Sequence, residues 1–151
     1  MFRIMEMGRT SLVGEVLKCP VDKRNIVPEG FHNSLHWQLG HISTVTDEIV
    51  FGKSGEVWSV PTEFKAFFEY GTKPSTWTAE PPPWDDVLFQ LTDQMANIRK
   101  VFAGKLDVKV KTNPFKGETV EELLLFNLFH ESIHSGNILA MLKCFGVRTP
   151  I

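Results

Sequence analysis

Residues 119–146, TVEELLLFNLFHESIHSGNILAMLKCFG, decide the fold. Thr119 and Glu122 match the Thr-x-x-Glu pattern of a helix capping box, in which each side chain bonds to a free backbone N–H group of the first turn. Leu, Phe, Ile and Met side chains then recur until Gly146, which can adopt the left-handed conformation that ends a helix. The stretch therefore predicts one long helix over residues 120–145.

Three further segments carry apolar residues at helical spacing. The first covers about residues 2–18. The second begins at Asn33 or Ser34, either of which can cap a helix, and runs to Gly52. The third follows a run of three prolines and covers about residues 84–104. Together with the helix over residues 120–145, these segments predict four amphipathic helices.

Two connecting segments add to this picture. Residues 53–83 are rich in proline and glycine, with a short helix expected around Thr62–Tyr70, and far exceed the usual length of about two to eight residues between neighbouring helices. Residues 105–118 include LDVKVK, whose alternation predicts a short strand. The expected fold class is therefore an all-α four-helix bundle, with a long crossover between its second and third helices, in a single domain over residues 1–151.

The composition excludes several classes of protein. With 42% hydrophobic and 23% charged residues, the chain is not expected to be disordered, and no apolar run reaches the roughly 20 residues that span a bilayer. The first residues carry scattered charges unlike a signal peptide, and Cys19 and Cys144 lie far apart, so we expect reduced thiols in the cytoplasm. The net charge of −2 argues against a nucleic-acid partner, and the lysines of residues 105–116 are interpreted as a solvated loop.

The histidines carry most of the functional information. His130 and His134 are four residues apart, so their side chains project from the same face of one helix, as two ligands of one metal ion must. Phe126, Phe129, Ile133 and Met141 are expected on the same side, which directs the pair toward the core. The other interpretation is that both histidines are satisfied by hydrogen bonds at the edge of the core.

His130, Glu131 and His134 also match the H-E-x-x-H pattern of zinc proteases, in which the glutamate polarises the attacking water. A protease needs a third ligand, and no histidine follows His134. The sequence also offers no strand edge to grip a peptide. We therefore do not expect a protease, and a third ligand must come from upstream.

His41 is the natural third ligand, because it follows Trp37 by one helical turn and lies next to the inward apolar stripe of the predicted second helix. That stripe consists of Ile42, Val45 and Ile49. His36 lies about 140° around that helix from His41 and would face away. His32 precedes the cap and has no fixed direction. A rival arrangement, in which His32 and His36 form a second pair that faces the histidines of the last helix, requires the second helix to begin earlier.

Four stretches of the chain are similar to one known family. They are NSLHWQLGHI at residues 33–42, FFEYGTKP at 67–74, TNPF at 112–115 and HESIHSGNI at 130–138. Their order and spacing resemble the DinB-like (damage-inducible) superfamily over essentially the whole chain.

The resemblance implies a four-helix bundle in which one histidine of the second helix and two of the fourth bind a divalent metal ion, usually zinc or nickel. By position these ligands are His41, His130 and His134. Relatives of known activity include enzymes that use low-molecular-weight thiols, as transferases or isomerases, and metal-dependent hydrolases. Homodimers are common, and the second helix often packs against the partner. This chain departs at Asn137, where many relatives carry glutamine.

Three neutral imidazoles leave a fourth coordination position for water, a thiol or a substrate oxygen. A metal ion there could supply hydroxide for hydrolysis, or bind a thiol as thiolate for transfer to an electrophile. Each ligating histidine should donate its other ring N–H to an acceptor. Five residues are candidates by position: Thr44, Glu48, Asn127, Glu131 and Asn137. Trp37 could wall the pocket, and Cys144 is expected to be a buried apolar side chain.

Three functions are compatible with this pattern. The first is a metal-dependent enzyme of the thiol S-transferase or hydrolase type that acts on a small molecule. The second is a non-catalytic dimeric helical bundle in which the metal has a structural or sensing role. The third is a dimeric helical interaction module whose histidines are simply packed and hold no metal.

Overall fold

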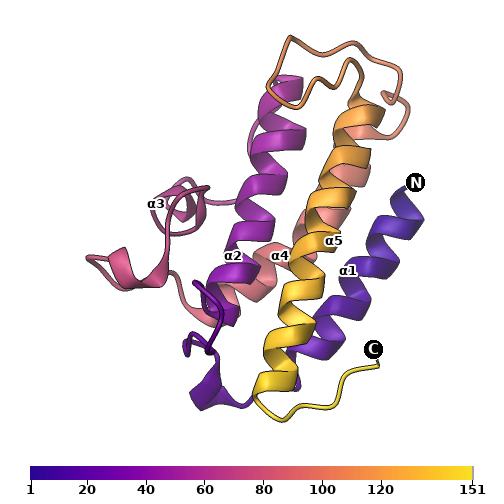
Figure 1. Cartoon of the computed structure of the whole chain (residues 1–151). Helices are drawn as coiled ribbons and strands as arrows, with labels where there is room; N and C mark the ends of the chain where they lie inside the picture. The colour runs from indigo at the N-terminus through magenta and orange to yellow at the C-terminus, as the bar shows by residue number, and fades with distance from the viewer. Residues whose placement is uncertain (151) are drawn as a thin grey trace.

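The computed structural model describes residues 1–150. Four long helices lie side by side (Figure 1), which confirms an all-α fold. Their bounds are α1 Phe2–Val16, α2 Leu35–Thr46, α4 Trp84–Phe102 and α5 Val120–Cys144. None of the described helices combines the length and hydropathy that crossing a membrane would require.

The predicted capping residues begin the second and last helices. The Ser34 hydroxyl accepts a hydrogen bond from the backbone N–H of Trp37 at 3.2 Å, which selects Ser34 over its neighbour as the cap of α2. The Thr119 hydroxyl accepts one from the backbone N–H of Glu122 at 3.3 Å at the start of α5. Gly146, with a φ of 78°, follows the end of α5 in the left-handed conformation.

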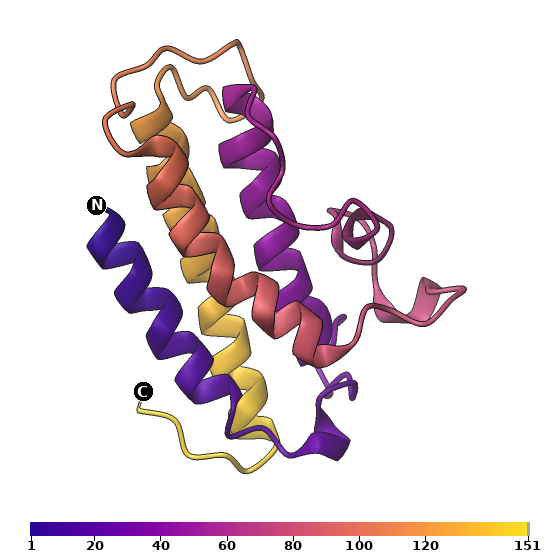
Figure 2. The same cartoon turned by 180° about the vertical axis from the view of Figure 1, so that it is seen from behind.

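Two pairs of neighbouring helices run antiparallel, α1 with α4 and α2 with α5 (Figure 1). Each of α1 and α2 packs against both α4 and α5. Figure 2 shows that α2 and α4 run in the same direction, because residues 53–83 lead the chain from the far end of α2 back along its side. This segment contains the short helix α3 (Phe64–Phe68), which is shorter than the expected helix over Thr62–Tyr70, and the 3₁₀ turn η3 (Pro74–Thr76). A further 3₁₀ turn, η1 (Val21–Lys23), lies between α1 and α2.

Two local predictions differ from the structure. The expected strand within residues 105–118 is absent from the described residues, where a single antiparallel bridge joins Lys109 to Thr119. One bridge cannot propagate because the facing residues lead directly into α5. The second helix does continue to Gly52, but its last six residues form a π-helix, η2 (Asp47–Gly52), which the apolar periodicity did not indicate.

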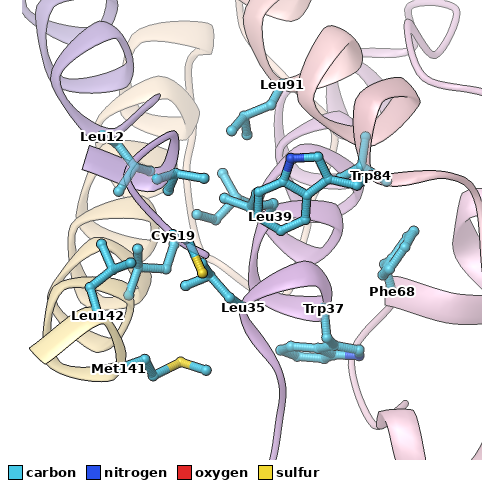
Figure 3. Packing of buried hydrophobic residues seen from close by; sticks show 14 of the residues in the cluster. Leu12, Cys19, Leu35, Trp37, Leu39, Phe68, Trp84, Leu91, Met141 and Leu142 are labelled. Carbon is cyan, nitrogen blue, oxygen red and sulfur yellow. The ribbon is translucent and has the colours of Figure 1, made fainter. Parts of the chain in front are cut away.

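Apolar side chains from all four long helices meet in two buried clusters, one of which is drawn in Figure 3. The fully buried leucines of the cluster in Figure 3 include Leu35, Leu39, Leu91 and Leu142. Each buried leucine stabilises the fold by about 1.5–3 kcal/mol relative to an exposed one. Every residue of α2 is buried within one chain, so the burial of Leu35–Thr46 gives no support to the expected packing of this helix against a partner subunit. The helix has no exposed face left to offer.

A buried polar network also joins the helices. The guanidinium of Arg9, only 2% exposed, pairs with both carboxylate oxygens of Glu131 and donates to the side-chain oxygen of Gln94. Gln94 in turn donates to a carboxylate oxygen of Asp47 at 2.6 Å. Asp47 also accepts hydrogen bonds from residues 59 and 60 of the long connection. The network therefore ties α1, α4, α5, η2 and the connection together.

Candidate metal centre

The structure brings His41, His130 and His134 together across the contact between α2 and α5. One potential ligand atom of each histidine lies within 4.8 Å of those of the other two. The ring centroids are 4.5 Å apart for His130 and His134, 4.6 Å for His41 and His134, and 5.3 Å for His41 and His130. At these distances the three imidazoles could bind one metal ion together. We call these residues the histidine trio.

The trio lies at the edge of the helical core. His41 is 3% exposed, whereas His130 and His134 are half-buried. The prediction that Phe129 and Ile133 share a buried face with the pair is wrong, because these side chains are 62% and 50% exposed. Apolar residues occur all around α5, so their spacing could not identify the face that packs inward.

Two hydrogen bonds fix the tautomers of His41 and His134. His41 donates from Nδ1 to the backbone carbonyl of Phe68 at 2.7 Å, and His134 donates from Nδ1 to Oε1 of Gln38 at 2.6 Å. With hydrogen on Nδ1, the Nε2 atom of each ring keeps a free lone pair. Among the described residues, Nδ1 of His130 has no partner. Hydrogen bonds like those of His41 and His134 hold metal-ligating histidines in place in proteins.

Neither acceptor is among the five residues expected from the sequence. Gln38 accepts its bond from His134 of α5, but on α2 it lies one helical turn before His41. Its position next to a predicted ligand is the signal that could have identified it. The carbonyl of Phe68 belongs to α3, and no sequence pattern indicates which backbone group will meet a distant helix. Of the five, Thr44 and Asn127 are buried, while Glu48 and Asn137 border clefts.

Glu131, the fifth expected acceptor, points away from the trio. It is 7% exposed and pairs with Arg9 of α1. In a zinc protease this glutamate would have to face the ion. The H-E-x-x-H match is therefore a coincidence of spacing, and the glutamate holds α5 against α1 instead.

Burial keeps the three imidazoles neutral. Desolvation lowers the pKa of His41 to about 4, an effect that its bond to the Phe68 carbonyl opposes. Desolvation, followed by repulsion from the other two rings, lowers the pKa of His134 to about 3. Desolvation also lowers the pKa of His130, against the attraction of the Glu131 charge. At neutral pH the trio therefore offers lone pairs without first having to lose protons.

Trp37 forms one wall of the site. Its ring stacks on that of His41, with centroids 4.3 Å apart and planes inclined by 15°. The indole N–H donates to the hydroxyl of Thr72 at 2.9 Å, which secures the long connection to α2. Trp37 therefore both fills the core and orients His41, as the sequence allowed.

Two clefts open at the trio. The larger, of about 500 Å³, is bordered mainly by polar side chains, among them Gln38, Lys73 and Asn137. The smaller, of about 290 Å³, is bordered mainly by apolar ones, among them Val45 and Phe115. Both clefts reach His41 and His130, so a small molecule in either one would lie against the trio.

The remaining histidines do not join the group. His36 is buried on another side of α2, where its Nδ1 lies 2.8 Å from the side-chain oxygen of Asn25 and its ring contacts those of Trp77 and Trp84. The rival arrangement, in which His32 and His36 form a ligand pair, is therefore wrong. His32 is exposed and borders the larger cleft. Cys144 is exposed as well, contrary to the expectation that it is buried, while Cys19 is buried.

The residues fit a divalent metal ion. Three neutral nitrogen ligands converge, two have fixed tautomers, and no Cys, Asp or Glu among the described residues completes a fourth position. No curated protein matches the chain. A family model of the DinB superfamily matches residues 5–138, which are most of the chain and include the whole histidine trio. The chain belongs to the DinB superfamily.

Proposed function

We propose that this protein is a divalent-metal-dependent enzyme of the thiol S-transferase type, with zinc or nickel held by His41, His130 and His134. The observation that carries the proposal is the open set of three neutral imidazoles at the junction of two clefts. The ion would supply Lewis-acid activation of a small nucleophile at its remaining coordination position. The proposal treats residues 1–151 as one domain, a four-helix bundle whose crossover is the segment 53–83.

The open position supports an enzyme over a structural or sensing metal. Structural zinc sites have four protein ligands, whereas catalytic sites keep one position for water or substrate. Within residues 1–150, no Cys, Asp, Glu or further His joins the three histidines. A purely packed trio is also less favourable, because the free nitrogen lone pairs would then be desolvated without a partner.

The surroundings of the trio favour a thiol over water as the nucleophile. Hydrolysis benefits from a carboxylate that takes a proton from water, but Glu131 is paired with Arg9 and no acidic residue borders the larger cleft among the described residues. A thiol that loses its proton to solvent needs no such base. Its sulfur would form a bond to the electrophilic carbon, and the leaving group would depart with the electron pair of its own bond.

A hydrolase is the second candidate function. Glu48 borders the smaller cleft and is the acidic side chain that could serve a hydrolytic reaction. Its ion pair with Lys53, at 3.6 Å and partly exposed, is weak enough to break. If Glu48 acts as a base, Glu48→Gln should abolish hydrolysis of activated esters while it leaves thiol binding intact.

The experiment compares two matched ligands on the cobalt-substituted protein. We expect 3-mercaptopropionate to change the visible spectrum of bound cobalt, and propionate, which lacks only the thiol, to leave it unchanged. The zinc-loaded protein should then accelerate reaction of the thiol with 1-chloro-2,4-dinitrobenzene, and His41→Ala should not. A cobalt spectrum that no thiol alters would contradict the proposal and favour a structural metal.

The proposal includes a homodimer. Large apolar side chains are exposed on both α1 and α5, and Leu125, Phe129 and Ile133 recur at four-residue steps along one face of α5; those of α1 are Ile4 and Met7. Exposed apolar groups of this kind are typical of surfaces that bind another protein. We expect light scattering to give the mass of two chains, and Phe129→Lys to give the mass of one. A wild-type protein with the mass of one chain would contradict this part of the proposal.

A further inference from the structure

Tyr70 occupies the junction between the two clefts. It borders the larger cleft of about 500 Å³ and the smaller one of about 290 Å³. The residues common to both clefts are His41, His130 and Tyr70, so it is the one shared residue outside the histidine trio. Tyr70 therefore lies within reach of a ligand in either cleft.

The backbone on both sides of Tyr70 is held against α2. Before it, the carbonyl of Phe68 accepts the hydrogen bond from Nδ1 of His41 at 2.7 Å. After it, the hydroxyl of Thr72 accepts a hydrogen bond from the indole of Trp37 at 2.9 Å. The position of Tyr70 relative to the trio is therefore set by two anchors, each of which reaches a side chain of α2 at the site.

The side chain of Tyr70, in contrast, is free. It is 90% exposed, and within residues 1–150 its hydroxyl makes no hydrogen bond. Removal of an aromatic ring from water is favourable. The free energy would therefore fall if the exposed ring of Tyr70 covered a neighbouring apolar surface. Rotation about its side-chain bonds requires no change in the backbone. A phenol also brings one O–H donor for a polar ligand atom.

We infer that Tyr70 is a substrate-contacting residue that closes over a small molecule bound at the histidine trio, with its ring covering the molecule and its hydroxyl donating a hydrogen bond to it. The inference rests on the proposed function. It also defines the substrate class: a polar part beside Lys73 and Asn137 in the larger cleft, an apolar part beside Val45 and Phe115 in the smaller one, and the reacting group between them beneath Tyr70.

The first test observes the tyrosine itself. Because Tyr70 is the only tyrosine of the chain, protein labelled with 3-fluorotyrosine gives a single fluorine resonance. In the zinc-loaded protein, the difference in its shift between H₂O and D₂O measures the exposure of the ring. We expect saturation with 3-mercaptopropionate to reduce this difference by at least half. An unchanged difference, while the cobalt spectrum reports bound thiol, would overturn the inference.

The second test measures affinity for 3-mercaptopropionate by titration of the cobalt-substituted protein. Tyr70→Phe removes the hydroxyl and should weaken binding by about fivefold, as expected for one neutral hydrogen bond, and Tyr70→Ala should weaken it further. Phe89→Ala is the matched control, because Phe89 is an aromatic residue of α4 that is 61% exposed and borders neither cleft. It should leave the affinity unchanged, and all three variants should keep their bound metal.

The outcomes separate this inference from the proposed function. If cobalt binds but no thiol alters its spectrum, the proposed function is wrong and the role of Tyr70 is overturned with it. If the thiol binds equally well to wild type, Tyr70→Phe and Tyr70→Ala, the proposed function stands and the role of Tyr70 is refuted.

Discussion

The imidazole of His134 donates a hydrogen bond from Nδ1 to the side-chain oxygen of Gln38, 2.6 Å away, and this bond joins α5 to α2 beside the histidine trio. It fixes both the rotation of the ring and the nitrogen that is left free for a metal. The side chain of Gln38 is 5% exposed, so water competes little for this contact.

Gln38→Leu should therefore weaken zinc binding. Loss of a hydrogen-bond partner behind a metal-ligating histidine typically costs about 10- to 100-fold in metal affinity. Competition with a chromophoric chelator measures the affinity. Gln90→Leu, on α4 and outside both clefts at the trio, is the matched control and should bind zinc as wild type does. Equal affinities for the two variants would show that the bond does not orient the ligand.

Gly40→Ala should reduce both stability and metal affinity. A Cβ at position 40 would overlap the buried ring of Phe68, whose carbonyl holds His41, so the ring must move. Overpacking of this kind costs about 1–3 kcal/mol. Gly8→Ala in α1 has no atom within 4 Å of the added carbon and should stabilise the protein by roughly 0.5–1 kcal/mol. Urea unfolding measures the stability of each variant, and the shift of the urea midpoint on addition of zinc reports its metal affinity. Equal changes in stability for Gly40→Ala and Gly8→Ala would count against the packing argument.

Arg9→Met should be strongly destabilising, because it leaves the carboxylate of Glu131 buried without its partner. Removal of one member of a buried pair costs about 3–5 kcal/mol. The double variant Arg9→Met, Glu131→Leu should recover much of the loss. The exposed pair of Glu6 and Arg99 is the control, and Arg99→Met should change the urea midpoint little. A double variant as unstable as Arg9→Met would contradict this account.

The metal-free protein should lose stability as the pH falls below about 6.5, the pKa that an unperturbed histidine has in the unfolded chain. In the folded protein the pKa of His41 is about 4 and that of His134 about 3, so between these values and 6.5 the unfolded chain binds more protons. Each group contributes at most about 1.4 kcal/mol per pH unit in this window. Urea midpoints of wild type should fall more steeply with acid than those of His134→Gln. Parallel curves would show that burial does not suppress protonation of this ring.

Local signals in the sequence predicted the helices well. Ser34, Thr119 and Gly146 act through neighbouring backbone groups, so their effect does not depend on the rest of the fold. The spacing of His130 and His134 placed both on one helical face for the same reason. His41 could be proposed because the direction of a helical side chain follows from its position relative to the apolar stripe.

Contacts between segments far apart in the chain could not be predicted. Arg9 was one of several scattered charges in the sequence, and only the packing of α1 against α5 shows that it pairs with Glu131. The carbonyl that holds His41 belongs to a segment whose path no periodicity describes. The exposed faces of α5 were misjudged because that helix is apolar on all sides, so the pattern contains no information about which side packs.

The central claim is that the trio holds one divalent ion, and the zinc content of the purified protein after loading and dialysis tests it most directly. The account predicts one zinc per chain in wild type, and none in His41→Ala, His130→Ala or His134→Ala, each of which should still show a helical circular dichroism spectrum. His36→Ala, which alters a buried histidine outside the trio, should keep its zinc. A wild-type protein without zinc, or a His41→Ala variant that retains it, would contradict the account.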